Sequence, residues 1–265
     1  MSRARDWRTA LSLFTVIPAG TGESLGEGDA ARAVAWLPAV GLLLGVLGGA
    51  VVAGVGGLSW GSPGGDAGFR RLLGAALAVA LIALLTGGLH LDGLADTSDG
   101  LGSRRPAPAA LDIMRRSDVG PMGVATLVLV LLIQVTALAA VPRASAAGLA
   151  LVLAAVTGRV AVVLATGSGP ARPGGFGALV AGRTTGRTRA MSVVLLGCAV
   201  AAVGVGLGGW VLAVRGLVAA AVGLAAGSAV RMIAVRRLGG VTGDVFGAVL
   251  EIAAAATLVV CALIA

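Results

Sequence analysis

The chain has too few charged residues to cover the surface of a water-soluble fold. Only 12% of its 265 residues are charged, whereas 57% are hydrophobic. Lysine and tyrosine are absent, and aromatic residues make up 3% of the chain. Nucleic-acid binding is disfavoured, because stacking side chains are scarce and the arginines are divided among separate segments. The composition favours an integral membrane protein.

Cysteine and histidine are too scarce to build a metal centre of their own. Cys198 and Cys261 lie in apolar stretches and lack the spacing of a zinc site or a disulfide framework. His90 is the single histidine of the chain. A metal site here must therefore use oxygen ligands, which favour magnesium or manganese over zinc.

Long apolar runs predict the fold class. A helix needs about 20 apolar residues to cross a hydrocarbon core of roughly 30 Å. We predict an all-α, polytopic integral membrane helix bundle of about seven transmembrane helices, packed closely through glycine and alanine. The predicted spans are about 34–56, 72–90, 120–141, 148–166, 191–214, 216–235 and 245–265.

The start of the chain differs from these spans. Arg3, Arg5 and Arg8 precede the apolar stretch 10–17, an order that also occurs in signal peptides. Pro18 ends the stretch, and no small-residue cleavage site follows. We therefore predict an interfacial segment of about residues 1–33, within a single membrane domain that covers residues 1–265.

The 20 basic residues, all arginine, predict the orientation. With a cytoplasmic N-terminus, most arginines fall on the cytoplasmic side, as the positive-inside rule requires. These are Arg3, Arg5, Arg8, Arg32, Arg104, Arg105, Arg115, Arg116, Arg172, Arg183, Arg187, Arg189, Arg236 and Arg237. The other side receives Arg70, Arg71, Arg143 and Arg215, while Arg159 and Arg231 fall within spans. The net charge of +8 suits contact with anionic lipid headgroups.

The densest acidic run lies at the cytoplasmic end of the second predicted span. Asp92, Asp96 and Asp99 stand at i, i+4 and i+7, so on a helix they share one face. Such carboxylates repel one another unless a cation lies between them, and no arginine interrupts the run. The EF-hand spacing is absent, and the three aspartates are candidate Mg²⁺ ligands. Next to a membrane, this array suits holding a pyrophosphate through metal or activating a hydroxyl group that attacks it.

His90 lies two residues before Asp92. It is either a hydrogen-bonded structural residue or a base that assists the acidic array.

A second acidic segment follows a pair of glycines near the C-terminus. Asp244 opens the last predicted span, two residues after Thr242, and is either a helix cap or a catalytic carboxylate. Glu251 lies two helical turns deeper on the same face. A carboxylate at that depth is costly unless it meets a metal or an opposite charge. We expect Glu251 to join the metal ligands or to pair with Arg159 or Arg231.

Arginines near the acidic array are candidates for substrate binding. Arg115 and Arg116 suit phosphate oxygens, although juxtamembrane positive charge that holds the topology is the alternative. Arg159 is a further candidate, because an arginine within a span usually lines a polar cavity.

At these residues the chain resembles cobalamin synthase, the adenosylcobinamide-GDP ribazoletransferase family of bacterial vitamin B12 assembly. The segment 88–100 is similar to the family's hallmark nearly residue for residue, and 240–244 is similar to its C-terminal motif. Shorter matches lie at 14–18, 37–41 and 175–177, so the resemblance covers essentially the whole chain.

The chain departs from the family pattern in one segment. The family has a basic–Asp–Ser–basic order after the methionine, whereas Met114 is followed here by Arg115, Arg116, Ser117 and Asp118. The acid and the second base are exchanged. The local charge is kept, but a phosphate-binding role cannot be carried over to any single residue of this segment.

The resemblance implies a reaction and a location. The 3′-hydroxyl of α-ribazole, or of its 5′-phosphate, attacks the phosphate attached to the aminopropanol arm of adenosylcobinamide-GDP. GMP leaves, adenosylcobalamin or its 5′-phosphate forms, and Mg²⁺ is required. The enzyme would be a multi-pass protein of the bacterial cytoplasmic membrane with its active site facing the cytoplasm. A homo-oligomer is left open.

The resemblance also suggests residue roles. Asp92 and Asp96 would hold the metal on the pyrophosphate. Asp99 or Asp244 would take the hydroxyl proton or complete the metal shell. The predicted substrate-binding residues are Arg115, Arg116, Arg159 and Thr242.

Three other kinds of membrane protein also carry acids within a bundle. A CDP-alcohol phosphotransferase would have arginine where Asp96 follows Ala95, and a prenyltransferase would use aromatic walls that this chain lacks. A cation transporter would place its acids near the middle of the bilayer, often at broken helices. Here most acids lie at one predicted face, which favours chemistry on a cytosolic substrate.

Overall fold

The computed structural model describes residues 3–19, 28–57 and 67–265, and these ranges are largely helical. No strand forms within them, although Pro170 and Val241 make an isolated parallel β-bridge. The prediction of an all-α fold is confirmed. The helices are α1 (Arg3–Phe14), α2 (Asp29–Ala35), α3 (Leu37–Gly57), α4 (Ala67–Leu85), α5 (Leu89–Gly102), α6 (Ala107–Ile113), α7 (Pro121–Ala140), α8 (Ala144–Ala165), α9 (Gly175–Val180), α10 (Gly186–Leu238) and α11 (Gly243–Leu263).

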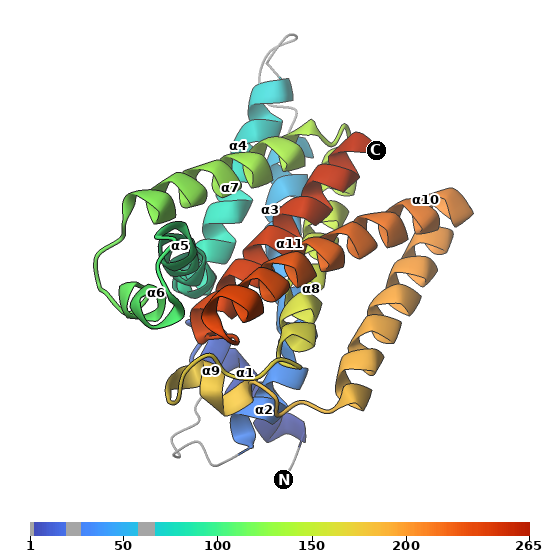
Figure 1. Ribbon diagram of the computed structural model, residues 1–265. Coiled ribbons are helices and arrows are strands. Elements are labelled where there is room, and N and C mark those ends of the chain that lie inside the picture. The colour runs from blue at the N-terminus through green and yellow to red at the C-terminus, as the bar shows by residue number, and fades with distance from the viewer. Residues whose placement is uncertain (1–2, 20–27, 58–66) are drawn as a thin grey trace.

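Six of the described helices are long and apolar enough to cross a membrane: α3, α4, α7, α8, α10 and α11. This confirms the prediction of a polytopic membrane bundle. α10 spans 53 residues, but Gly208 and Gly209 leave the helical conformation, and Gly209 has a φ of 73°. Figure 1 shows the chain turning back sharply within α10, so its two halves correspond to two of the predicted spans.

Two predicted boundaries were wrong. The break within α10 was expected beside Arg215, but the apolar run continues through the glycine-rich residues 204–209, where hydropathy gives no signal. The second span was expected to include residue 90, but α4 ends at Leu85. Gly87 and Gly88 adopt left-handed backbone conformations there, and the turn they make begins α5 as a separate helix.

α8 and α11 form the centre of the bundle, since their spans are the most buried of the six. α8 meets α3 through glycines. A Cβ atom added at Gly148 would lie 2.8 Å from the carbonyl oxygen of Gly49, and one added at Gly49 would be equally close to Gly148. Membrane helices gain packing energy from such close approach of small residues.

The short helices gather at the end of the bundle where the site lies. In Figure 1, α1, α2 and α9 lie together below the lower ends of α3 and α8, while α5 and α6 lie near the start of α11. Part of the segment that is predicted to be interfacial, residues 1–33, lies outside the described residues, but α1 contacts this end. Trp7 of α1 packs against Trp36, with ring centroids 5.8 Å apart.

We expect Gly148→Ala to destabilise the bundle, because its Cβ atom would push α3 and α8 apart. Overpacking of this kind costs about 1–3 kcal/mol. The matched control is Gly54→Ala on α3, where nothing lies within 4 Å of the added atom. Thermal unfolding in detergent should show a lower midpoint for Gly148→Ala only. Equal midpoints for the two variants would contradict the importance of this contact.

Candidate functional site

The geometry of the site depends on the crossing of α5 and α11. A Cβ atom added at Gly93 of α5 would lie 2.7 Å from the carbonyl oxygen of Asp244. One added at Gly247 of α11 would lie 2.7 Å from the carbonyl oxygen of His90. Because neither glycine has a side chain, the two backbones touch. The acidic segments of the two helices therefore come to one place.

The aspartates of α5 lie in different surroundings. Asp92 is exposed, and Asp96 is half-buried. Partial burial, and then the negative charges of Asp92, Asp244 and Asp99, raise the pKa of Asp96 to about 6. The positive charge of Arg172 opposes this shift. The carboxylates of α5 that the sequence predicts to share a helix face therefore do repel one another. Asp244 of α11 adds to this repulsion.

Asp99 points at the start of α7. Its two carboxylate oxygens accept hydrogen bonds from the backbone N–H groups of Gly120, at 2.7 Å, and Gly123, at 2.8 Å. A Cβ atom added at either glycine would lie 2.5 Å from a carboxylate oxygen. Asp99 therefore satisfies N–H groups at the beginning of α7 that have no partner within the helix.

Asp244 is held by Thr242 and Arg172. The Thr242 hydroxyl donates to Oδ2 of Asp244 at 3.1 Å and accepts from the N–H of Val245, which makes Thr242 the cap of α11. A guanidinium nitrogen of Arg172 lies 3.4 Å from the same carboxylate oxygen. The alternative in which Asp244 itself caps the helix is therefore wrong.

Arg172 was not predicted to be a site residue. It lies in the loop after α8, and the β-bridge between Pro170 and Val241 brings this loop beside the start of α11. The N–H of Ala171 donates to the carbonyl oxygen of Val241 at 3.0 Å. Arg172 also donates to the carbonyl oxygen of Leu111 in α6, at 3.2 Å. The only indication of Arg172 in the sequence is the family match at 175–177, which marks this loop but does not include Arg172 itself.

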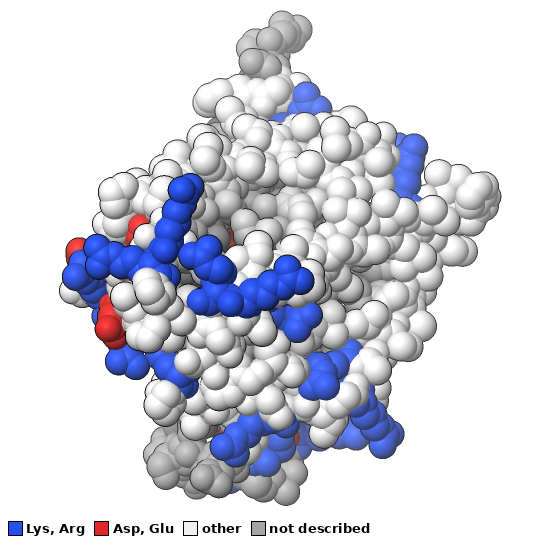
Figure 2. Space-filling view, viewed as in Figure 1, with Lys and Arg blue, Asp and Glu red and all other residues white. Residues whose placement is uncertain are grey.

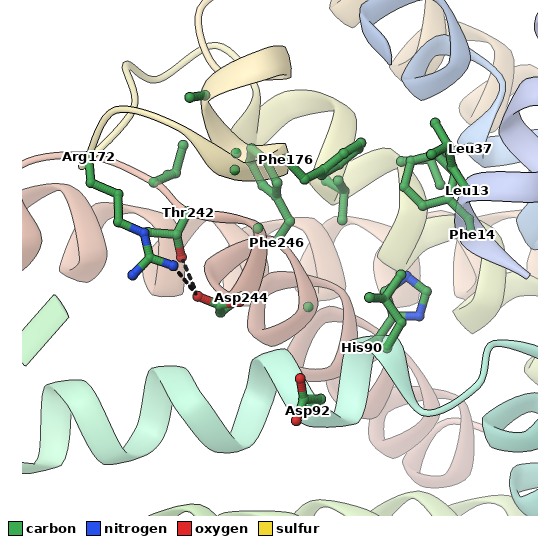
Figure 3. Close-up of a pocket in the computed structure, with 18 of the residues that line it drawn as sticks. Leu13, Phe14, Leu37, His90, Asp92, Arg172, Phe176, Thr242, Asp244 and Phe246 are labelled. Atoms are coloured by element: carbon green, nitrogen blue, oxygen red, sulfur yellow. Dashed lines mark hydrogen bonds and ion pairs between the residues drawn. The ribbon is translucent and has the colours of Figure 1, made fainter. Parts of the chain in front are cut away.

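Asp92, Arg172, Thr242 and Asp244 line a cavity of about 290 Å³, whereas Asp96 and Asp99 lie outside its lining. Figure 3 shows Arg172 bonded to Asp244 on one side, with Asp92 of α5 across from Asp244. An apolar part of the wall carries Phe14 and Phe176, whose rings meet edge to face with centroids 5.5 Å apart. Charged groups and aromatic rings in one cavity suit a ligand that carries both phosphates and rings.

His90 lines the same cavity and is buried. Burial, and then the positive charge of Arg159, lower the pKa of His90 to about 3. The imidazole is therefore neutral at physiological pH and a poor proton acceptor. This favours a hydrogen-bonding role for His90 over the role of base.

The predicted substrate-binding arginines lie outside the cavity lining. Arg115 and Arg116 are exposed, in the segment after α6. Arg159 is fully buried in α8 and donates to the carbonyl oxygen of Ala155 at 3.0 Å. Its Nε has no hydrogen-bond partner in the described part of the chain. Figure 2 shows arginines gathered over the left and lower parts of this face, with isolated ones near the top.

Glu251 meets an amide instead of an arginine. Its carboxylate accepts a hydrogen bond from the side-chain nitrogen of Gln134 in α7, at 2.7 Å. Arg231 donates to the hydroxyl of Ser168. In the ranges that the structure describes, Glu251 forms no contact ion pair with Arg231 or Arg159, although the positive charge of Arg159 still acts on it at longer range. Glu251 is also not among the residues that line the cavity.

The remaining carboxylates suit a divalent cation in combination with a substrate. Among the described residues, no three acidic, histidine or cysteine side chains are close enough to hold a metal alone. Mg²⁺ commonly uses one or two carboxylates and takes its other ligands from water and substrate phosphates. Asp92 and Asp96 fit that pattern, and the raised pKa of Asp96 reflects burial and then the negative charges around it.

Known proteins identify the family. A family model described as cobalamin-5-phosphate synthase matches residues 6–262. The chain belongs to this family. An adenosylcobinamide-GDP ribazoletransferase of Frankia casuarinae is 43% identical, over 97% of this chain and 94% of the relative. A relative of the same name from Bradyrhizobium diazoefficiens is 37% identical, over 92% of this chain and 87% of the relative. Another, from Corynebacterium efficiens, is 36% identical, over 96% of this chain and 90% of the relative. No solved structure matches the chain.

All five segments that resemble the cobalamin synthases reach the cavity. The hallmark segment supplies Asp92 from α5, and the C-terminal motif supplies Asp244. The shorter matches supply Phe14, Leu37 and Phe176. Segments that are distant in the sequence therefore form one site in this member of the family.

We expect Asp96→Asn to stabilise the metal-free protein. The carboxyl binds its proton more tightly in the folded state, because its pKa there is about 6 against an ordinary value of 3.8. Ionisation of Asp96 therefore lowers the free energy of unfolding. This loss of stability is complete above pH 6 and becomes smaller as the pH falls toward 4. Unfolding midpoints in detergent with EDTA should rise for Asp96→Asn at pH 8 and rise less at pH 5.

The matched control is Asp99→Asn, the same chemical change on the same helix. An amide has one acceptor oxygen and cannot satisfy both N–H groups of α7, so this variant should lose about 0.5–2 kcal/mol at both pH values. A lower midpoint for Asp96→Asn than for wild type at pH 8 would contradict the charge repulsion inferred at Asp96.

Proposed function

We propose that the chain is a membrane transferase that joins adenosylcobinamide-GDP to α-ribazole. The 3′-hydroxyl of α-ribazole, or of its 5′-phosphate, forms a bond to the phosphorus next to the corrinoid's aminopropanol arm. The bond from that phosphorus to the bridging oxygen breaks, so that GMP leaves and adenosylcobalamin or its 5′-phosphate forms. The observation that carries this proposal is the meeting of all five family segments at one cavity.

Arg172 binds phosphate oxygens in this proposal. Its guanidinium lines the cavity, and its partner Asp244 lies at 3.4 Å, which is long for a charge-assisted hydrogen bond. A planar guanidinium can donate to two phosphate oxygens at once and can balance the charge that develops on the leaving GMP. Arg172 thus takes the task that the sequence suggested for Arg115 and Arg116.

Asp244 accepts the proton of the attacking hydroxyl. Of the two carboxylates considered for this task, Asp244 lines the cavity, whereas both oxygens of Asp99 accept hydrogen bonds from α7. The Thr242 hydroxyl holds Oδ2 of Asp244 and keeps the carboxylate in one orientation. A base held in this way needs no rearrangement when the hydroxyl arrives.

Asp92 and Asp96 would hold Mg²⁺ for the pyrophosphate of the substrate. When bound, the ion would neutralise phosphate oxygens and stabilise charge on the leaving group. The support for this assignment is the all-oxygen donor set and the unbalanced negative charge around Asp96. The two carboxylates would hold the ion, while Arg172 would supply a second positive group to the phosphates.

The assay that tests the function uses purified protein with adenosylcobinamide-GDP, α-ribazole and Mg²⁺, and measures release of GMP. Arg172→Ala should lower kcat/KM by at least about a hundredfold, as loss of a transition-state partner commonly does. Arg116→Ala is the control, because the exposed Arg116 should change activity by less than about threefold. A larger loss in Arg116→Ala than in Arg172→Ala would overturn the assignment of Arg172. Absence of GMP with the wild-type protein would overturn the function.

The cavity end of the bundle faces the cytoplasm of a bacterial cell in this proposal, because arginines concentrate there. In a chain with Cys198 and Cys261 replaced by serine, Ser117→Cys should be shielded from an impermeant thiol reagent added to intact cells. Pro142→Cys, in the exposed turn between α7 and α8, should react. Reaction of Ser117→Cys from outside would invert the orientation.

A further inference from the structure

A second hollow, of about 590 Å³, lies directly beside the cavity. Three residues line both spaces: Leu13 of α1, and Leu89 and Asp92 of α5. The Asp92 carboxylate therefore stands at the boundary between the two. A ligand in the second hollow could extend a polar group past Asp92 toward Arg172 and Asp244.

The two spaces differ in chemistry. The first is lined by Arg172, Asp244 and His90 as well as Asp92. Among the described residues that line the second, Asp92 is the one charged side chain. Most of its other side chains are aliphatic, and these are Leu13, Val16, Leu89, Leu91, Val119 and Leu127.

The hydroxyl groups in the second hollow donate their hydrogen bonds to backbone carbonyl groups. Thr15 donates to the carbonyl oxygen of Leu11 at 2.7 Å, and Thr86 donates to that of Ile82 at 2.9 Å. Neither hydroxyl is therefore placed to donate to a ligand. The second hollow is an apolar slot with a single carboxylate where it meets the reaction cavity, and it is unsuited to a pyrophosphate.

We infer that this second hollow is the subsite of the alcohol substrate, an apolar-base nucleoside whose sugar hydroxyl passes Asp92 to reach the phosphate. This inference rests on the proposed function, in which that alcohol is α-ribazole, a benzimidazole nucleoside. The flat apolar base lies among the aliphatic side chains, where its burial is favourable. The sugar hydroxyl enters between Asp92 and Asp244, and the proton of this hydroxyl passes to Asp244.

The arrangement accounts for the separation of the two substrates. The nucleotide substrate needs Arg172, which lies on the α11 side of Asp92 beside Asp244. The alcohol needs an apolar slot, which lies on the side of the α4–α5 turn and α7. Two substrates that enter from opposite sides of Asp92 can react by in-line displacement, in which the attacking and leaving oxygens lie on opposite sides of the phosphorus.

The test fills the slot without touching the cavity. Val119 lines only the second of the two spaces and is 49% exposed, so that Val119→Trp can be accommodated without a buried clash. We expect the KM for α-ribazole to rise at least about tenfold. The KM for adenosylcobinamide-GDP should stay within about twofold of wild type. The matched control is Val124→Trp on α7, which is 51% exposed and lines neither space.

A binding measurement separates this inference from the proposed function, since it needs no turnover. In the background without native cysteines, Val16→Cys places a thiol in the second hollow. α-Ribazole alone should slow its alkylation at least about fivefold, and GDP should not. Unchanged alkylation with α-ribazole, protection by phosphatidylglycerol instead, or a wild-type KM for α-ribazole in Val119→Trp would each overturn the subsite. Absence of GMP from both substrates would overturn the transfer reaction, while protection by α-ribazole would still support the slot.

Discussion

The contact between α5 and α11 is the constraint on which the site depends. Gly93 and Gly247 let each backbone touch the other at the residues beside Asp92 and Asp244. A methyl group at either position would separate the helices and the carboxylates that they carry. The same principle holds at Gly177 of α9, where an added Cβ atom would lie 2.7 Å from the backbone nitrogen of Gly243. Glycine thus brings polar backbone and side-chain groups together in an otherwise apolar bundle.

This close packing creates an imbalance of charge. Asp92, Asp96 and Asp244 lie near one another, and among the described residues Arg172 is the cation that contacts them, through Asp244. Like charges that are partly removed from water repel more strongly than they do in solution, and the raised pKa of Asp96 expresses that cost. A cation, or a substrate that arrives with one, relieves it. The same imbalance that weakens the metal-free fold therefore favours a metal-bound pyrophosphate.

The sequence predicts best what depends on local periodicity. The spacing of Asp92, Asp96 and Asp99 predicts that they share one face of a helix, because residues at i, i+4 and i+7 follow the helical repeat. The partner of Asp99 could not be predicted in this way, since Gly120 lies 21 residues further along the chain. Arg172 was missed for a related reason, because an isolated β-bridge leaves no periodic pattern. Hydropathy likewise gave the spans of the bundle but not the break within α10, where glycine changes direction without lowering apolarity.

Two acids outside the cavity lining fix α7 at two depths. Asp99 of α5 holds the N–H groups at the start of α7, and Glu251 of α11 accepts from Gln134 well inside the same helix. Leu127, which lines the second hollow, lies between these two attachments. A buried carboxylate that anchors a neighbouring helix needs a hydrogen-bond donor there, and the Gln134 amide supplies it. In the proposed mechanism the acids therefore divide their tasks by position. Asp92 and Asp244 take part in the reaction, and Asp99 and Glu251 hold the wall of the proposed alcohol subsite.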